Sequence, residues 1–185
     1  MGVLADRAER RAEDLLAVPL PRRWRHVQAV AIKADRISTG LSAEDSDILV
    51  ASAWLHDIGY APPVVSTGLH ALDGARFLRG EGFPERVCGL VAHHSCAIFE
   101  AAERGLADDL TAAFTDECSP VTDALWYADM TTGPDGESLE VADRLAEVRQ
   151  RYGPDHLVTR FWSRAEPTLV AAVQRTQDRI AVQPM

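Results

Sequence analysis

Apolar and polar residues follow one another along this chain mostly at the interval of an α-helix, with apolar positions three or four residues apart. Near the start, Leu4, Leu15 and Leu16 stand among arginines and glutamates in this way. The strict alternation that is typical of a half-buried strand is nearly absent. We therefore expect an all-α fold, with helices at residues 3–17, 22–38, 43–57, 69–80, 84–94, 97–118 (one or two short helices), 120–130, 138–151 and 155–180.

One of these segments is far more apolar than the others. Residues 48–55 read Ile-Leu-Val-Ala-Ser-Ala-Trp-Leu, so a helix here has almost no polar face. Ser42 is a good N-cap for it, and Asp45 follows three residues later as an imperfect capping box. Gly59 and the prolines after it end the helix. The pattern predicts a central buried helix against which the others pack.

Turn-forming residues divide the rest of the chain. Gly105 separates the short helices of residues 97–118, and residues 131–136 (Thr-Thr-Gly-Pro-Asp-Gly) are expected to form a loop. Pro167 is expected to kink the last helix or to restart it. No repeat, low-complexity stretch or linker interrupts the series, so we expect residues 1–185 to form a single compact multi-helix bundle.

Composition and charge narrow the classes of function. The chain of 185 residues is 46% apolar and 25% charged, which is ordinary for a globular protein, and its three irregularly spaced cysteines do not suggest a disulfide framework. The formal net charge of −9 argues against broad binding to nucleic acid or to an anionic membrane. No apolar run approaches the ~20 residues that span a bilayer, and the charged first residues do not resemble a secretory signal. We therefore expect a cytoplasmic protein.

The histidines are concentrated in one part of the chain, since five of the six lie between residues 26 and 94. The pair His56-Asp57 ends the strongly apolar helix, where packing would bury both side chains. Burial of a carboxylate is costly unless it is paired or bound to a metal ion. This position therefore predicts a metal site at the end of the central helix.

The other candidate ligands occupy comparable places in the predicted helices. His26 lies early in the second helix, and His70 begins the short helix after the proline break. His93 ends the helix that starts at Pro84, and Asp129 ends the apolar run 125–129. Each candidate is on an inner face or at the end of a helix, from which it can point toward a common centre.

The order of these six residues resembles the HD-domain superfamily of metal-dependent phosphohydrolases, over about residues 22–135. Ile58-Gly59 after the His-Asp pair and Gly74-Ala75 after His70 strengthen the resemblance. An N-terminal helix and C-terminal helices would flank this core. The resemblance implies a first metal ion on His26, His56, Asp57 and Asp129, and a second ion on the bridging Asp57 with His70 and His93.

The ligand types also indicate the metal and the chemistry. Imidazole and carboxylate ligands suit iron, manganese, zinc, cobalt or nickel, so we expect one or two divalent transition metals, most simply a dinuclear centre. Two such ions acidify a shared water and bind phosphate oxygens. His56 and Asp57 would then be the catalytic residues of a phosphohydrolase.

Three further residues are candidate substrate contacts. Lys33 lies seven residues after His26, on about the same face of the helix, and its alternative is a side chain that extends to water. Tyr60 follows the His-Asp pair and could donate to a phosphate oxygen or simply pack. His94 is expected to contact substrate or to support the ligands.

Among members of the superfamily, the motif order is most similar to the small bacterial enzymes that split diadenosine tetraphosphate symmetrically. Those enzymes have His-Thr-Thr-Gly where this chain reads His93-His94-Ser95-Cys96. The resemblance implies a small phosphorylated substrate, first of all a nucleotide, with no nucleic-acid polymer and no membrane as partner; a homodimer is compatible with it. Two alternatives stay open: a di-iron oxygenase that cleaves a C–P or C–C bond, and a non-catalytic metal or nucleotide sensor.

Overall fold

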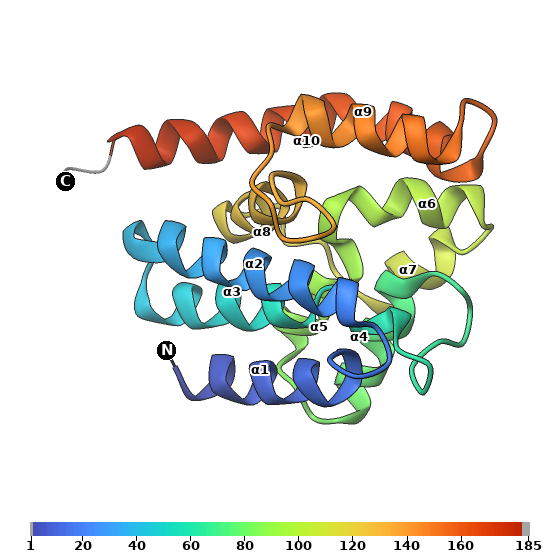
Figure 1. Ribbon diagram of the computed structural model, residues 1–185. Coiled ribbons are helices and arrows are strands. Elements are labelled where there is room, and N and C mark those ends of the chain that lie inside the picture. Colours follow the sequence, from blue (N-terminus) through green and yellow to red (C-terminus); the bar gives the residue numbers. More distant parts are fainter. Residues whose placement is uncertain (1, 183–185) are drawn as a thin grey trace.

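The computed structural model describes residues 2–182, and α-helices make up most of this part of the chain (Figure 1). Between residues 2 and 182 the only β-type pairing is an isolated bridge of Thr132 with Ser138. The expected all-α fold is confirmed. The elements are α1 (Val3–Leu16), α2 (Pro21–Ile37), η1 (Ser38–Gly40), α3 (Ala43–Leu55), η2 (Ile58–Tyr60), α4 (His70–Gly80), α5 (Glu85–His93), η3 (His94–Cys96), α6 (Ala97–Glu103), α7 (Ala107–Ala113), α8 (Pro120–Met130), α9 (Val141–Tyr152) and α10 (Leu157–Val182).

Helix α3 lies at the centre of the bundle, as its composition predicts. Every residue from Ile48 to Leu55 is buried, and the helix packs against α1, α2, α5 and α8. It begins at Ser42, whose Oγ accepts the backbone N–H of Asp45 at 3.1 Å and donates to the carboxylate of the same residue. The helix ends at Leu55 rather than at residue 57, so His56 and Asp57 lie in the turn that leaves it.

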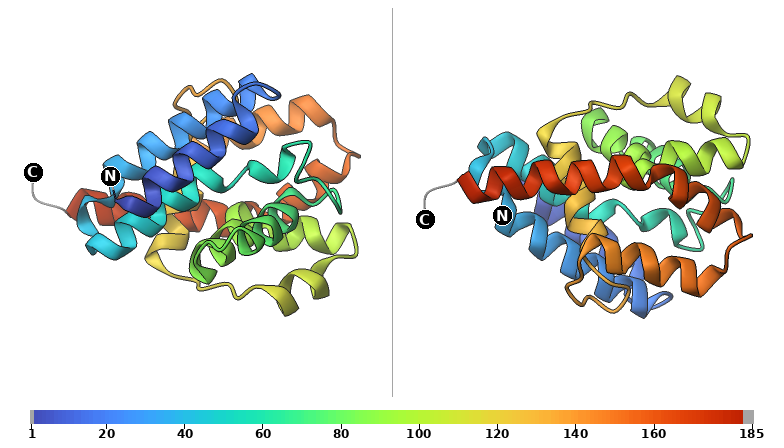
Figure 2. Two further views of the ribbon diagram at one scale, coloured as in Figure 1. Left: turned by 90° about the horizontal axis from the view of Figure 1, so that it is seen from below. Right: turned by 90° about the horizontal axis from the view of Figure 1, so that it is seen from above.

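Helices α9 and α10 lie on the side of the molecule opposite α1 (Figure 1). In the views of Figure 2, α10 runs along the length of the molecule. Helix α10 packs against α6, α8 and α9. On α8, the buried carboxylate of Asp123 accepts hydrogen bonds from Arg175 and Arg179 of α10. Pro167 does not restart this helix, which continues through it from Leu157 to Val182.

Helix α9 begins three residues later than the pattern predicts. The backbone N–H of Leu139 donates to the carbonyl of Thr131 at 2.9 Å, and that of Gly133 donates to the carbonyl of Glu137 at 2.7 Å. These bonds hold residues 131–139 in a closed loop, so the helix starts only at Val141. None of the helices described between residues 2 and 182 is both long and apolar enough to cross a bilayer.

Two glycines allow α4 to lie directly on the turn that follows α3. A Cβ atom at Gly59 would be 1.8 Å from the carbonyl oxygen of His70, and one at Gly74 would be 3.2 Å from the backbone nitrogen of Gly59. Only a residue without a side chain fits between backbones at this separation. The close approach places the first residue of α4, His70, beside the His56-Asp57 turn.

Candidate metal centre

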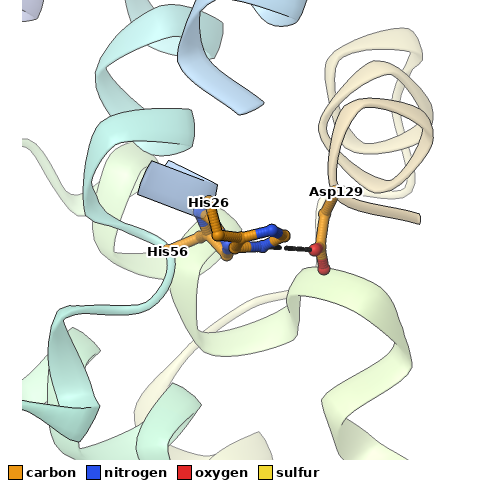
Figure 3. A group of neighbouring side chains, drawn as sticks. All are labelled: His26, His56 and Asp129. Carbon is orange, nitrogen blue, oxygen red and sulfur yellow. Dashed lines mark hydrogen bonds and ion pairs between the residues drawn. The ribbon is translucent and has the colours of Figure 1, made fainter. Parts of the chain in front are cut away.

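Side chains from α2, α4, α8 and the turns after α3 and α5 meet at one buried place. Their ligand atoms form two groups, in each of which all the atoms lie within 4.8 Å of one another. Figure 3 shows the first group, with the imidazoles of two histidines directed toward one carboxylate. The groups are His26, His56 and Asp129, and Asp57, His70 and His94.

Three of the four histidine rings are held by the backbone. In each, Nδ1 lies within hydrogen-bond distance of a carbonyl oxygen, which only accepts, so Nδ1 carries a proton and donates it. The opposite nitrogen, Nε2, then faces the centre of the site and is the atom available to bind a metal ion. The bonds run from His26 to Gly133 (2.9 Å), from His56 to Ala53 (2.8 Å) and from His94 to Val91 (2.6 Å).

The geometry of the first group fits a bound cation. Nε2 of His26 is 3.1 Å from Oδ1 of Asp129, and Nε2 of His56 is fully buried with no hydrogen-bond partner among residues 2–182. A ring nitrogen with a lone pair and a carboxylate oxygen are both acceptors, so a proton or a metal ion belongs between them. An unpaired buried nitrogen beside an ionised carboxylate fits a divalent transition metal.

The carboxylate of Asp57 faces both groups. Its Oδ2 is 3.8 Å from Nε2 of His26 and 3.5 Å from Nε2 of His56. Its Oδ1 is 3.6 Å from Nε2 of His70 and 4.0 Å from Nε2 of His94. One carboxylate with an oxygen toward each group is the arrangement that a bridging ligand between two ions needs.

The charges in the site favour bound cations. Burial alone would lower the pKa of His56, but Asp57 and Asp129 raise it to about 9. Burial would raise the pKa of Asp57, yet Arg23 and then His56 hold it well below its usual value. Burial lowers the pKa of His70, with a further contribution from nearby His94. The carboxylates are therefore ionised and His70 is neutral, as a ligand must be. His56 carries a second proton on Nε2, between Asp57 and Asp129, and a bound metal ion would replace this proton.

The prediction that His93 faces the second ion is wrong, because the structure places His94 there instead. His93 is the last residue of α5. Its Nε2 lies 3.0 Å from the carbonyl oxygen of Phe114, and its ring belongs to neither group. The backbone leaves the helix at His94, with ψ of 146°, and this directs the second ring toward His70, with the two Nε2 atoms 3.1 Å apart. From the sequence, substrate contact or support of the ligands was favoured for His94 over the role of a ligand.

The residue after His94 contributes a feature that the sequence did not reveal. Ser95 and Cys96 both have left-handed backbone, with φ of 46° and 59°, which is uncommon for residues other than glycine. In this conformation the hydroxyl of Ser95 donates to Oδ2 of Asp129. The strained turn thus holds the carboxylate whose other oxygen faces His26.

A cavity of about 300 Å³ opens onto both groups. Tyr60, a candidate substrate contact, lines this cavity. The Tyr60 ring stacks on the ring of His70, with the centroids 4.1 Å apart. The guanidinium of Arg23 lies over the face of the Tyr60 ring, 3.6 Å from its centroid. The prediction that Lys33 contacts the substrate is wrong. Its ammonium does not line the cavity, because it donates to Thr131 Oγ1 at 2.9 Å and to Ser138.

Several residues of the cavity were not among the predicted ligands or substrate contacts. Arg23 pairs with Oδ2 of Asp57, and its position three residues before His26 puts it on the same helical face, a signal that could have been used. Glu100 has one carboxylate oxygen 4.0 Å from Nδ1 of His70, and the other accepts from Arg104. No local pattern shows that α9 and α10 cover the site; their side chains in the cavity wall include Arg144, Arg151, Tyr152, Phe161 and Trp162.

Comparison with known proteins agrees with this geometry. A family model described as HD domain matches residues 23–148, which is more than half of the chain and includes every residue of the two groups. Neither the curated proteins nor the solved structures gave a match. HD domains bind divalent metals, and most are metal-dependent hydrolases of phosphorylated compounds. The chain belongs to the HD domain family.

Proposed function

We propose that the protein is a metal-dependent phosphohydrolase with a dinuclear centre, acting on a small phosphorylated molecule, first of all a nucleotide. The observation that carries the proposal is the position of Asp57, which turns one oxygen to each of two groups of histidines. A site for one ion alone would not need both oxygens at these distances.

In this proposal His26, His56 and Asp129 hold one ion, His70 and His94 hold the other, and Asp57 joins them. Iron, manganese, zinc, cobalt and nickel all suit such ligands. When bound, two such ions lower the pKa of water and offset the negative charge of a phosphate group.

The side chains around the centre position the substrate. Arg23 and Arg104 line the cavity and can donate to the phosphate oxygens that the ions leave free. Arg23 is held by Asp57 on one side and by the face of Tyr60 on the other, so its guanidinium needs little reordering to receive an anion. Ser95 keeps Asp129 oriented, which maintains the first group during turnover.

The size of the cavity favours a small substrate. About 300 Å³ is at the lower end of the range of ~300–1,000 Å³ that is usual for small-molecule sites. A dinucleotide joined by four phosphates would extend well beyond it. This cavity by itself takes a simple phosphoester or the phosphate end of a nucleotide, and the rest of a larger substrate would lie outside it.

The test is a hydrolysis assay on the purified chain with its metals quantified. Nucleotides and phosphoesters are supplied with Mn²⁺ or Fe²⁺ while phosphate release and oxygen uptake are recorded together. We expect phosphate release that Asp57→Asn abolishes and that Asp108→Asn, an exposed change on α7, leaves intact. Oxygen uptake with Fe²⁺ but no phosphate would identify an oxygenase. If neither phosphate release nor oxygen uptake is observed with any compound of the panel, this result contradicts an enzymatic function and favours a sensor.

A further inference from the structure

A second cavity, of about 330 Å³, adjoins the cavity of the metal centre. The two cavities share four lining residues, Arg23, His26, Arg144 and Arg151. Arg144 and Arg151 belong to α9, outside the elements that carry the ligands, and Arg151 lies beyond the segment that the family model matches. The two cavities are therefore adjacent, and these two arginines lie at the border between them.

The charged lining of the second cavity is basic. Among the residues described, its walls carry arginines and no carboxylate. Glu147 fixes both arginines of the border from outside: it accepts from Nη1 of Arg144 at 2.7 Å and from Nη2 of Arg151. Arg22 forms an ion pair with Asp135, an exposed residue that does not line the second cavity. One carboxylate between Arg144 and Arg151 leaves a net positive charge at the border.

Arg144 also has a donor that nothing in the described chain satisfies. Its side chain is only 12% exposed, and its Nε has no hydrogen-bond partner among the residues described. The guanidinium lies 5.8 Å from the ring centroid of Trp162, which restricts its position. A buried charged donor without an acceptor is costly, so this arginine indicates a ligand that brings acceptor oxygens.

The remaining wall of the second cavity is apolar and rigid. It consists of Pro19, Leu20, Pro21 and Pro134. Pro19 and Leu20 precede α2, Pro21 is its first residue, and Pro134 lies in the loop before α9. Because proline has a fixed φ, these residues present a surface that changes little on binding. Such a surface suits a flat apolar group, such as the face of a nucleobase.

We propose that the second cavity binds the part of the substrate that does not react, with a further phosphate group at Arg144 and Arg151 and a base against the prolines. This inference rests on the proposed function, because it takes one phosphate to lie at the metal centre. It narrows the substrate to nucleotides that carry more than one phosphate, either a nucleoside diphosphate or a bisphosphate.

The kinetic test uses the full-length, Mn²⁺-loaded protein. We compare kcat/KM for adenosine 5′-monophosphate, adenosine 5′-diphosphate and adenosine 3′,5′-bisphosphate, and expect one of the doubly phosphorylated substrates to be preferred over the monophosphate. Arg151→Gln should lower that preference about tenfold, the effect of losing one charge-assisted hydrogen bond. The matched control is Arg149→Gln, the same change on the same helix at a residue that pairs with Glu166 and lines neither cavity. It should leave the preference as it is.

Arg144→Gln should act in the same direction as Arg151→Gln. Because Arg144 is mostly buried, the more exposed Arg151 carries the test if the Arg144 variant does not fold. The inference is overturned if the wild-type protein does not prefer a doubly phosphorylated substrate, or if Arg151→Gln lowers kcat/KM equally for all three.

A binding measurement separates this inference from the proposed function. Inorganic tripolyphosphate is titrated into the same proteins by calorimetry, with no turnover of a nucleotide required. If no nucleotide is hydrolysed, the proposed function fails, and the titration still decides about the second cavity. Binding of tripolyphosphate about tenfold weaker in Arg151→Gln than in Arg149→Gln would support a phosphate site in the second cavity. Equal binding by the two variants would overturn this site.

Discussion

Replacing Gly59 with alanine tests whether the contact between α4 and the turn after α3 positions the second group of ligands. The new Cβ would lie 1.8 Å from the carbonyl oxygen of His70 and 2.8 Å from its Cα. To reach an ordinary contact distance of 3.4 Å or more, this backbone would have to retreat by roughly 1.6 Å. Because the clash is with backbone rather than with a flexible side chain, we expect the upper part of the usual range for overpacking, a loss of about 3 kcal/mol in the free energy of unfolding.

The assay for Gly59→Ala is equilibrium unfolding in urea, followed by helical circular dichroism, together with the metal content of the folded protein. The midpoint should fall with little change in slope, and the protein should retain one ion rather than two because His70 is displaced from Asp57. Gly80→Ala is the control, at the end of α4, the helix whose first residue contacts Gly59. No atom lies within 4 Å of the new Cβ, so this change should stabilise the protein by ~0.5–1 kcal/mol. If Gly59→Ala were as stable as the wild type and bound both ions, the reasoning would be refuted.

Three other changes test separate features of the site and the fold. His94→Ala should remove one metal ion per chain while His93→Ala retains both, measured by elemental analysis, because only the ring of His94 faces Asp57. Ser95→Ala should weaken binding of the first ion about tenfold in competition with a chelator, because Asp129 loses the donor that orients it. Asp123→Asn should lower the free energy of unfolding by about 1–2 kcal/mol at neutral pH, a value that allows for the partly exposed arginines.

The pH dependence of the last variant has a definite sign. Arg175 and Arg179 lower the pKa of Asp123 below its ordinary value of 3.8 although burial opposes this, so the carboxylate stabilises the fold above that pH. The stabilisation is lost as the pH falls through the lower, folded-state pKa. The difference between wild type and Asp123→Asn should therefore be constant near neutrality and shrink in acid below 3.8. A difference that grows in acid would contradict this assignment, as would loss of both ions in His93→Ala or unchanged chelator competition in Ser95→Ala.

The local pattern of the sequence was sufficient for the helices and for most of the ligands. Ser42 and Pro120 begin helices where their capping and φ preferences predict, and the apolar run before His56 is buried as expected. Burial at the end of an apolar helix pointed to His56 and Asp57, and the resemblance to HD domains added His26, His70 and Asp129. The structure brings these five residues together.

What could not be predicted depends on backbone direction and on distant contacts. Whether His93 or His94 faces the centre depends on where α5 ends, and a difference of one residue rotates a helical side chain by about 100°. The left-handed turn at Ser95 contains no glycine that would signal it. The approach of α9 to the site depends on tertiary packing, so Arg144 and Arg151 carry no local mark of their place beside the metal centre.

The hydrogen bonds that orient the imidazoles have a consequence for how this protein can change through evolution. Their acceptors are main-chain oxygens of Ala53, Val91 and Gly133, and every amino acid supplies such an oxygen. The side chains at these three positions therefore do not set the direction of the rings, provided that the backbone path is preserved. The orientation of the candidate ligands is in this sense insulated from the identity of their neighbours, whereas the walls of the cavity are made of side chains and change with every substitution.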